Sequence, residues 1–144
     1  MSFITKEELK TVSTLEIVNL ITGTEDSIVE DIIEESVELM ENYLYQYYDT
    51  DTIFSAIGQA RKKIVVRLLK KIVIHEIFVR RSRVMNQTVK DGYDEAIALL
   101  DKAGSGDIKL DLPSKIVDSD GDGVPDKEAT FLKLGSNKNY PNHW

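Results

Sequence analysis

Four aspartates follow one another at short intervals near the C-terminal end of the chain, with two glycines between them. Counted from the first aspartate, carboxylates occupy positions 1, 3, 5 and 9, a glycine occupies position 6, and a valine carbonyl falls at position 7. Oxygen ligands at these positions, with glycine at the sharp turn, are the arrangement of EF-hand-type calcium loops. The spacing predicts that one calcium ion (Ca2+) is held by Asp118, Asp120, Asp122, the Val124 carbonyl and Asp126.

The aspartate loop lacks one ligand of that pattern. Position 12 is Ala129, where an EF-hand loop carries a bidentate acid. Without this ligand, we expect weak binding, with a dissociation constant of roughly 10⁻⁴ to 10⁻³ M. A metal-free cluster of Asp-Gly turns is the alternative, because the same residues favour tight turns. No nucleophile or general base lies near the loop in the sequence, so a bound ion would stiffen the chain rather than take part in a reaction.

The rest of the sequence contains no recognisable catalytic constellation. It has no cysteine, which excludes a disulfide framework, a thiolate zinc site and a cysteine nucleophile. It has no Ser, His and Asp in the order of a catalytic triad, no HExxH zinc-binding motif and no glycine-rich phosphate-binding loop. Of its two histidines, His75 lies in the most apolar segment beside Glu76 and is interpreted as a packed histidine. We therefore expect that the protein is not an enzyme.

Charge is segregated along the chain, although the net charge is only -7. Residues 25–47 contain eight acidic side chains and no Lys or Arg, whereas residues 61–83 contain nine of the 18 basic side chains and one acid. The basic segment is interpreted as a solvated helix face, or as a surface that meets nucleic acid or an acidic protein, such as segment 25–47 of a neighbouring copy. The candidate interface residues are Arg61, Arg67, Lys70, Lys71, Glu30, Glu34 and Glu38.

Helical periodicity predicts an all-α protein, a compact bundle of two long and about three shorter helices with a short strand and an irregular extended C-terminal arm. A capping box at Thr5 and Glu8 opens the first short helix, and a second ends at Gly23. The two long helices follow: one spans 25–48 after a Thr24 cap, and the other begins at Thr52 or Ser55 and runs to about residue 82. Another helix begins at Asn86 or Thr88 and ends at Gly104 or Gly106, and "DIKLDL" (107–112) alternates like a strand.

The chain is expected to divide into a helical core, residues 1–112, and a C-terminal extension, residues 113–144. The extension holds all three prolines and the aspartate loop, and it ends in apolar side chains that include Trp144. Because exposed apolar surface is unfavourable, we expect this arm to dock on a partner. Apolar runs are interrupted too often by charge for a membrane span, and no secretory signal is visible, so no membrane contact is expected.

The order of elements resembles a known family. The segments that carry the resemblance are "ITKEEL", the acidic helix ending in "YLYQYY", "EIFVRR", and "DGYDEAIALLDKAGSGDIKL". Over residues 3–112 they are similar to the small head–tail connector (adaptor, or head-completion) proteins of tailed phages and Mu-like prophages. The chain departs from the family in having "DTDTIFSAIG" where members often have prolines, and residues 113–144 lie outside the resemblance.

The resemblance implies a structural role in the virion. Such proteins form a ring, typically of twelve copies, beneath the portal protein, and they provide the platform for the next connector, stopper or tail protein. DNA would only pass through the ring lumen, and the protein would reside in the neck of the virion after assembly in the host cytoplasm. Segregated acidic and basic helices suit the head-to-tail contacts that a ring of identical chains requires.

Two other functions fit parts of the sequence. A helical nucleic-acid-binding or regulatory protein would use the basic 61–83 helix, and its DNA affinity would fall linearly with the logarithm of salt concentration. A stand-alone calcium-binding module would use the aspartate loop, and it would fail to fold without the ion.

Overall fold

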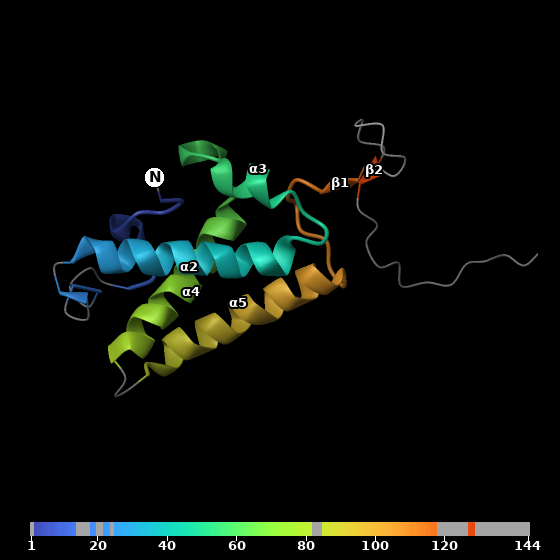
Figure 1. Ribbon diagram of the computed structural model, residues 1–144. Coiled ribbons are helices and arrows are strands. Elements are labelled where there is room, and N and C mark those ends of the chain that lie inside the picture. The colour runs from blue at the N-terminus through green and yellow to red at the C-terminus, as the bar shows by residue number, and fades with distance from the viewer. Residues whose placement is uncertain are drawn as a thin grey trace, which may run out of the picture.

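The computed structural model describes residues 2–13, 18–19, 22–23, 25–81, 85–117 and 127–128, and Figure 1 shows how their elements are arranged. The element order is η1 (Lys6–Thr11), α2 (Asp26–Leu44), α3 (Thr50–Ser55), η2 (Gly58–Ala60), α4 (Lys63–Arg81), α5 (Gln87–Ser105), β1 (Ile116–Val117) and β2 (Lys127–Glu128). The two strands pair antiparallel over two residues each. The prediction of an all-α fold is confirmed.

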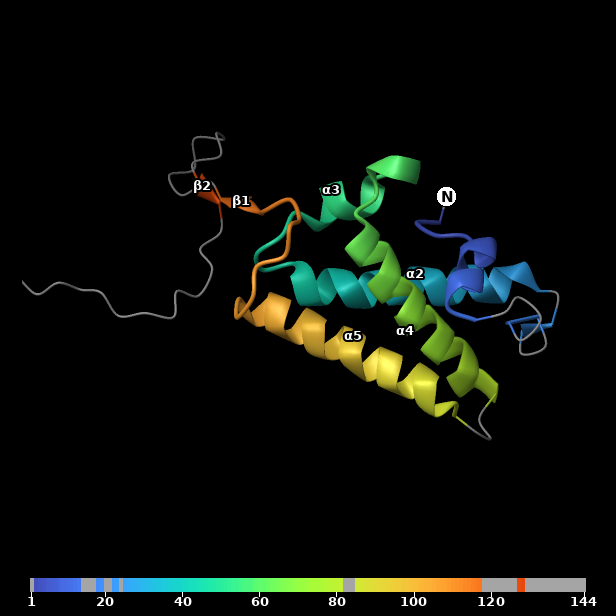
Figure 2. The same ribbon diagram turned by 180° about the vertical axis from the view of Figure 1, so that it is seen from behind.

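Helices α2, α4 and α5 form the body of the protein, and each packs against the other two. All three are 19 residues long, which is one more long helix than the two that the sequence predicted. Figure 1 shows α2 in front of α4, with α5 running beside α2, and Figure 2 shows the same bundle from behind, with α4 in front. No helix in the described ranges combines the length and the apolar character needed to cross a bilayer.

The core lies where the apolar stripes of these three helices meet. Helix α4 supplies Leu69, Ile72 and Val73, which are fully buried, and it is the central helix that its broad stripe predicts. The same core includes Met40 of α2 and Leu100 of α5. Burying side chains of this size contributes about 1.5–3 kcal/mol each, which makes the three-helix interface the main source of stability.

The N-terminal segment packs on the bundle through η1. The predicted capping box is present, because the Glu8 carboxylate accepts a hydrogen bond of 2.9 Å from the Thr5 backbone N–H. The second short helix expected up to Gly23 falls largely outside the described residues, and so does Thr24. Helix α2 itself begins at Asp26 with Glu25 at the N-cap position.

The long helix expected from Thr52 or Ser55 to residue 82 is broken into three elements. Helix α3 is capped by Asp49, whose carboxylate accepts from Thr52 N–H at 3.1 Å, and it ends at Ser55. The chain then turns at Gly58, which has φ of +58°, a left-handed conformation that glycine adopts without strain. Helix α4 therefore begins only at Lys63, and α3 projects away from it as a corner (Figure 1).

The strand expected at 107–112 does not form. Helix α5 ends at Gly106, with φ of +83°, and the following residues cross the end of α2 in irregular conformation. The Leu110 N–H donates to the Tyr48 hydroxyl at 2.8 Å, and Tyr48 bridges to Ser114. Because Ile108, Leu110 and Leu112 pack into the core as a lone segment, their backbone has no adjacent strand with which to form a ladder.

Candidate functional site

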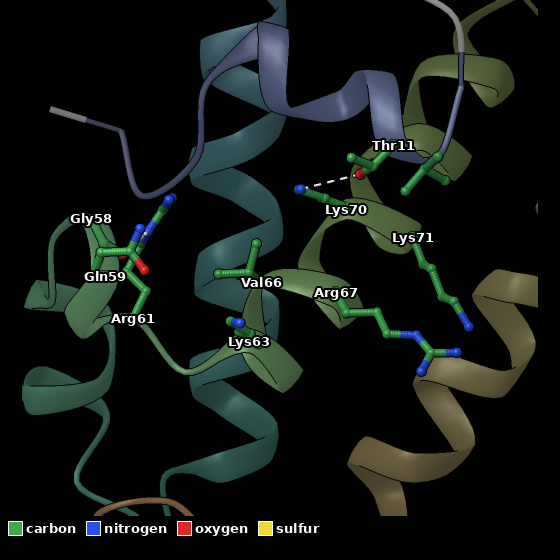
Figure 3. Close-up of a pocket in the computed structure, with 10 residues that line it drawn as sticks. Thr11, Gly58, Gln59, Arg61, Lys63, Val66, Arg67, Lys70 and Lys71 are labelled. Atoms are coloured by element: carbon green, nitrogen blue, oxygen red, sulfur yellow. Dashed lines mark hydrogen bonds between the residues drawn. The ribbon is translucent and has the colours of Figure 1, made fainter.

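A basic groove of about 740 Å³ runs along the exposed face of α4, between η1 and η2. Figure 3 looks onto this face, with α2 lying behind α4. Its lining includes the apolar side chains of Val12 and Val66 and five cationic ones. The five cations are Arg61, Lys63, Arg67, Lys70 and Lys71.

Two of these five cations are already paired within the protein. The Arg61 guanidinium contacts the Glu8 carboxylate at 2.6 Å and donates to the Phe3 carbonyl at 2.7 Å. Lys71 contacts Glu95 of α5 at 2.5 Å, and this hydrogen bond lowers the pKa of Glu95. Although Arg61 and Lys71 were both predicted interface residues, their charges are compensated inside the chain.

The Arg61–Glu8 pair predicts a measurable pH dependence of stability. The hydrogen bond from Arg61 lowers the pKa of Glu8 from 4.5 to about 2. Because the folded-state pKa is depressed, the pair's stabilisation is complete above pH 4.5 and is lost as the pH falls toward 2. Glu8→Gln is expected to lower the free energy of unfolding by about 1–2 kcal/mol near neutral pH, a value reduced for partial solvent screening.

Urea unfolding of wild type and Glu8→Gln between neutral and acid pH measures this effect. The difference between the two proteins should shrink as the pH falls below 4.5. Glu7→Gln is the matched control, because Glu7 is exposed and makes no ion pair with any described residue. A constant difference across the whole pH range would contradict the assigned role of Glu8.

The other three cations of the groove have no anionic partner among the described residues. Lys70 donates to the Thr11 hydroxyl at 3.2 Å, the contact drawn as a dashed line in Figure 3, and it forms no ion pair with a described residue, although its charge helps to lower the pKa of Glu8. Lys63 and Arg67 are exposed and make no ion pair within the part of the chain that the structure describes. The groove therefore offers three positive charges over an apolar floor.

A second groove, of about 430 Å³, lies along the exposed face of α2 and carries the opposite charge. Its apolar lining comes from Phe3, Ile33, Val37 and Phe54, and its acidic lining comes from Glu34, Glu38, Glu41 and Asp51. None of the four carboxylates is paired with a cation from the described ranges. Partial burial, followed by the charges of Asp51 and Glu38, raises the pKa of Glu41.

The two grooves lie along different helices. Helices α2 and α4 bury their apolar stripes against each other, and the charged rows lie on the faces left exposed. Helix α2 is in front in Figure 1 and α4 is in front in Figure 2, which is the same molecule turned by 180°. The molecule thus presents an acidic groove along α2 and a basic groove along α4, and a third depression shares lining residues with both.

Besides the paired Arg61 and Lys71, the predicted interface residues fall into three groups. Arg67 and Lys70 line the basic groove, and Glu34 and Glu38 line the acidic one, each without an ion-pair partner in the described chain. Glu30 is exposed on α2 but does not line the groove. The predicted calcium ligands and Trp144 lie outside the described residues, and within the described residues no group of three or more His, Asp or Glu could hold a metal ion.

Sequence reasoning did not name three of the groove residues. Lys63 lies four residues before Arg67, and Glu41 lies three residues after Glu38, so helical spacing was an available signal for both. Asp51 comes from α3, and no local pattern places it beside α2. His75 is half-buried and stacks on Tyr93 at 3.7 Å, which fits its interpretation as a packed histidine.

Comparisons with known proteins give one relationship. No curated protein and no solved structure matches the chain significantly. The family model described as bacteriophage Mu, Gp36 matches residues 3–125, which extends past the 3–112 range of the resemblance and into the aspartate loop. Because this match covers most of the 144 residues, the chain is a bacteriophage protein that belongs to the Mu Gp36 family.

Proposed function

We propose that this protein is a structural, non-enzymatic component of the virion: a head–tail connector, or adaptor, that forms a ring under the portal and joins the capsid vertex to the tail. Membership of a phage Mu family supports the phage setting. The connector role is supported by the resemblance of its helices to small adaptor proteins. The proposal includes a ring of twelve copies in the virion neck, assembled in the host cytoplasm, with DNA passing only through the lumen.

The observation that carries this proposal is that one chain has an acidic groove and a basic groove on different helices, each with charges that have no ion-pair partner among the described residues. A contact between two different faces of identical subunits is heterologous, and it closes into a ring when the rotation between subunits allows. Charge complementarity guides such contacts and disfavours the wrong pairing of like faces. In a ring, the neighbour on one side supplies the counter-charge for the basic groove and the neighbour on the other side supplies it for the acidic groove.

Reversing the free cations of the basic groove tests the proposal. Lys63→Glu, Arg67→Glu and Lys70→Glu, combined in one variant, are expected to weaken self-association at least tenfold, because they place like charges against the acidic groove. Mass photometry of the protein, alone and with the portal protein of the same phage, measures the oligomer. Arg80→Glu is the control, since Arg80 is exposed on α4 outside the groove.

Circular dichroism and thermal melting of the same variants separate loss of assembly from loss of fold. The triple variant should keep its helicity, because none of the three side chains is fully buried. A wild-type protein that stays monomeric both alone and with the portal would refute the connector function.

A calcium ion bound to the C-terminal segment would have an accessory role in assembly. The loop at 118–126 would bind one ion and stiffen the C-terminal segment that we expect to contact the portal, a neighbouring copy or the tail. Repeating the assembly measurement with millimolar calcium and with a chelator tests this part separately. Calcium dependence that disappears in Asp120→Ala plus Asp122→Ala would support it, and assembly indifferent to calcium would contradict it.

A further inference from the structure

The charged residues of the two grooves have the same spacing on their helices. Glu34, Glu38 and Glu41 of α2 stand at i, i+4 and i+7, and Lys63, Arg67 and Lys70 of α4 stand at the same intervals. All six line their respective grooves. In each row the first two side chains are exposed and the third is half-buried.

Each row places like charges next to one another on its helix. Side chains four residues apart on a helix are neighbours, and like charges at this spacing destabilise the helix. No oppositely charged side chain among the described residues forms an ion pair with any of the six. A partner helix with the opposite charge at the same spacing would relieve the repulsion in both rows.

We infer that α4 of one copy docks along α2 of the next copy, with Arg67 facing Glu38 at the centre of the contact. This inference rests on the proposed self-assembly and specifies the residues that form it. With a rise of about 1.5 Å per residue, parallel helices would pair Glu34 with Lys63 and Glu41 with Lys70. Antiparallel helices would instead pair Glu34 with Lys70 and Glu41 with Lys63, with each of these pairs displaced by about 1.5 Å along the helix axis. Either direction leaves Arg67 opposite Glu38.

A second copy fits the basic groove better than a nucleic acid does. The matching acidic row is part of the same chain, and the net charge of -7 opposes the approach of a polyanion. The apolar side chains of Val12 and Val66 also suit a protein surface.

Site-specific cross-linking tests the pairing of Arg67 with Glu38. Because the chain has no native cysteine, only the introduced thiols can react. A variant with both Arg67→Cys and Glu38→Cys is treated with a bismaleimide that reaches about 8–10 Å, the distance between packed helix axes. In a head-to-tail assembly every copy links to the next, so denaturing gels should show a ladder of dimers, trimers and higher species. Each single-cysteine variant can give dimers at most.

A matched pair on the same helices controls for random collision. Arg80→Cys with Glu35→Cys places thiols on exposed positions outside both grooves and should give no ladder. The experiment is run on the full chain, alone and with the portal protein. If the 67/38 variant gives no ladder while the wild type forms rings on the portal, this inference is overturned and the connector function stands.

Charge exchange provides an independent test. Arg67→Glu and Glu38→Arg are each expected to weaken assembly about tenfold, and the double variant should recover to within about threefold of wild type. The same exchange at Arg80 and Glu35 should change little. An unrecovered double variant would overturn the pairing. If Arg67→Glu also lowers affinity for duplex DNA and Glu38→Arg does not restore assembly, the groove is a nucleic-acid site instead.

Discussion

Replacing Gly104 with alanine is expected to lower the free energy of unfolding by about 3 kcal/mol. Gly104 lies inside α5, where that helix closely approaches the backbone of α2. A Cβ atom at this position would sit 2.4 Å from the Tyr43 carbonyl oxygen and 3.3 Å from its carbonyl carbon. Because these are backbone atoms, no change of rotamer relieves the clash, and the two helices must move apart across the core.

Gly92→Ala is the matched control on the same helix. A Cβ at Gly92 would meet only the flexible Lys71 side chain, at 3.8 Å, which is an ordinary contact. Alanine favours a helix interior over glycine by about 1 kcal/mol, so this variant should be more stable than wild type. Urea unfolding followed by circular dichroism measures both changes. If Gly104→Ala is as stable as Gly92→Ala, the close approach of α5 to α2 described here is wrong.

Replacing Tyr48 with alanine should have a comparable or larger effect, a loss of about 3–5 kcal/mol. Tyr48 is only 1% exposed at the end of α2, and its ring belongs to the core. Its hydroxyl accepts the hydrogen bond from the Leu110 N–H, and its backbone bridges to Ser114. The substitution removes both the packed ring and the acceptor for the segment that follows α5.

The conservative variant separates these two contributions. Tyr48→Phe keeps the ring and leaves the Leu110 N–H without its acceptor, a cost of about 1–3 kcal/mol. Hydrogen exchange at the Leu110 amide should also become faster in this variant. Ile57→Ala serves as the control, because Ile57 is 70% exposed and lies away from this segment in the sequence. Equal stability of Tyr48→Phe and wild type would show that the hydroxyl bond does not hold the segment.

The parts of the fold that were predicted correctly are those governed by local sequence. The apolar stripes of α2 and α5 repeat at three and four residues, which indicates a helix without reference to the rest of the chain. The cap of α5 is Asn86, whose side chain accepts from Thr88 N–H at 2.9 Å, and its stop is the left-handed Gly106. Both had been predicted as alternatives from residue type alone.

The errors arise where distant residues decide the conformation. The break before α4 depends on Arg61, whose guanidinium binds Glu8 and the Phe3 carbonyl more than 50 residues earlier. Gly58 was a local signal, but a single glycine is also tolerated inside a helix. The segment 107–112 has strand-like alternation, yet the tertiary structure gives it the end of α2 as its neighbour instead of a strand.

In the candidate site, too, the features set by local sequence were predictable and those set by distant residues were not. Segregation of acidic and basic residues is visible in the sequence, and it leads to Arg67, Lys70, Glu34 and Glu38, all of which line the grooves. Which charges remain available is decided by folding, since Arg61 finds its partner in a distant part of the chain. The charged side chains that lack an ion-pair partner among the described residues could be identified only after the ion pairs of Arg61 and Lys71 were known.

The attachment of residues 106–117 to the end of α2 also defines how the protein would bear mechanical tension. Four hydrogen bonds join this segment to residues 45–49, which connect α2 to α3. They run from Leu110 N–H to the Tyr48 hydroxyl, from Asp49 N–H to the Pro113 carbonyl, from Lys115 N–H to the Tyr47 carbonyl, and from Lys115 Nζ to the Tyr45 carbonyl. A pull applied to the chain beyond Val117 meets these bonds before it reaches any hydrogen bond of α5. The force is therefore transferred sideways into the connection between α2 and α3, and the attached segment keeps α5 from unravelling from its C-terminal end.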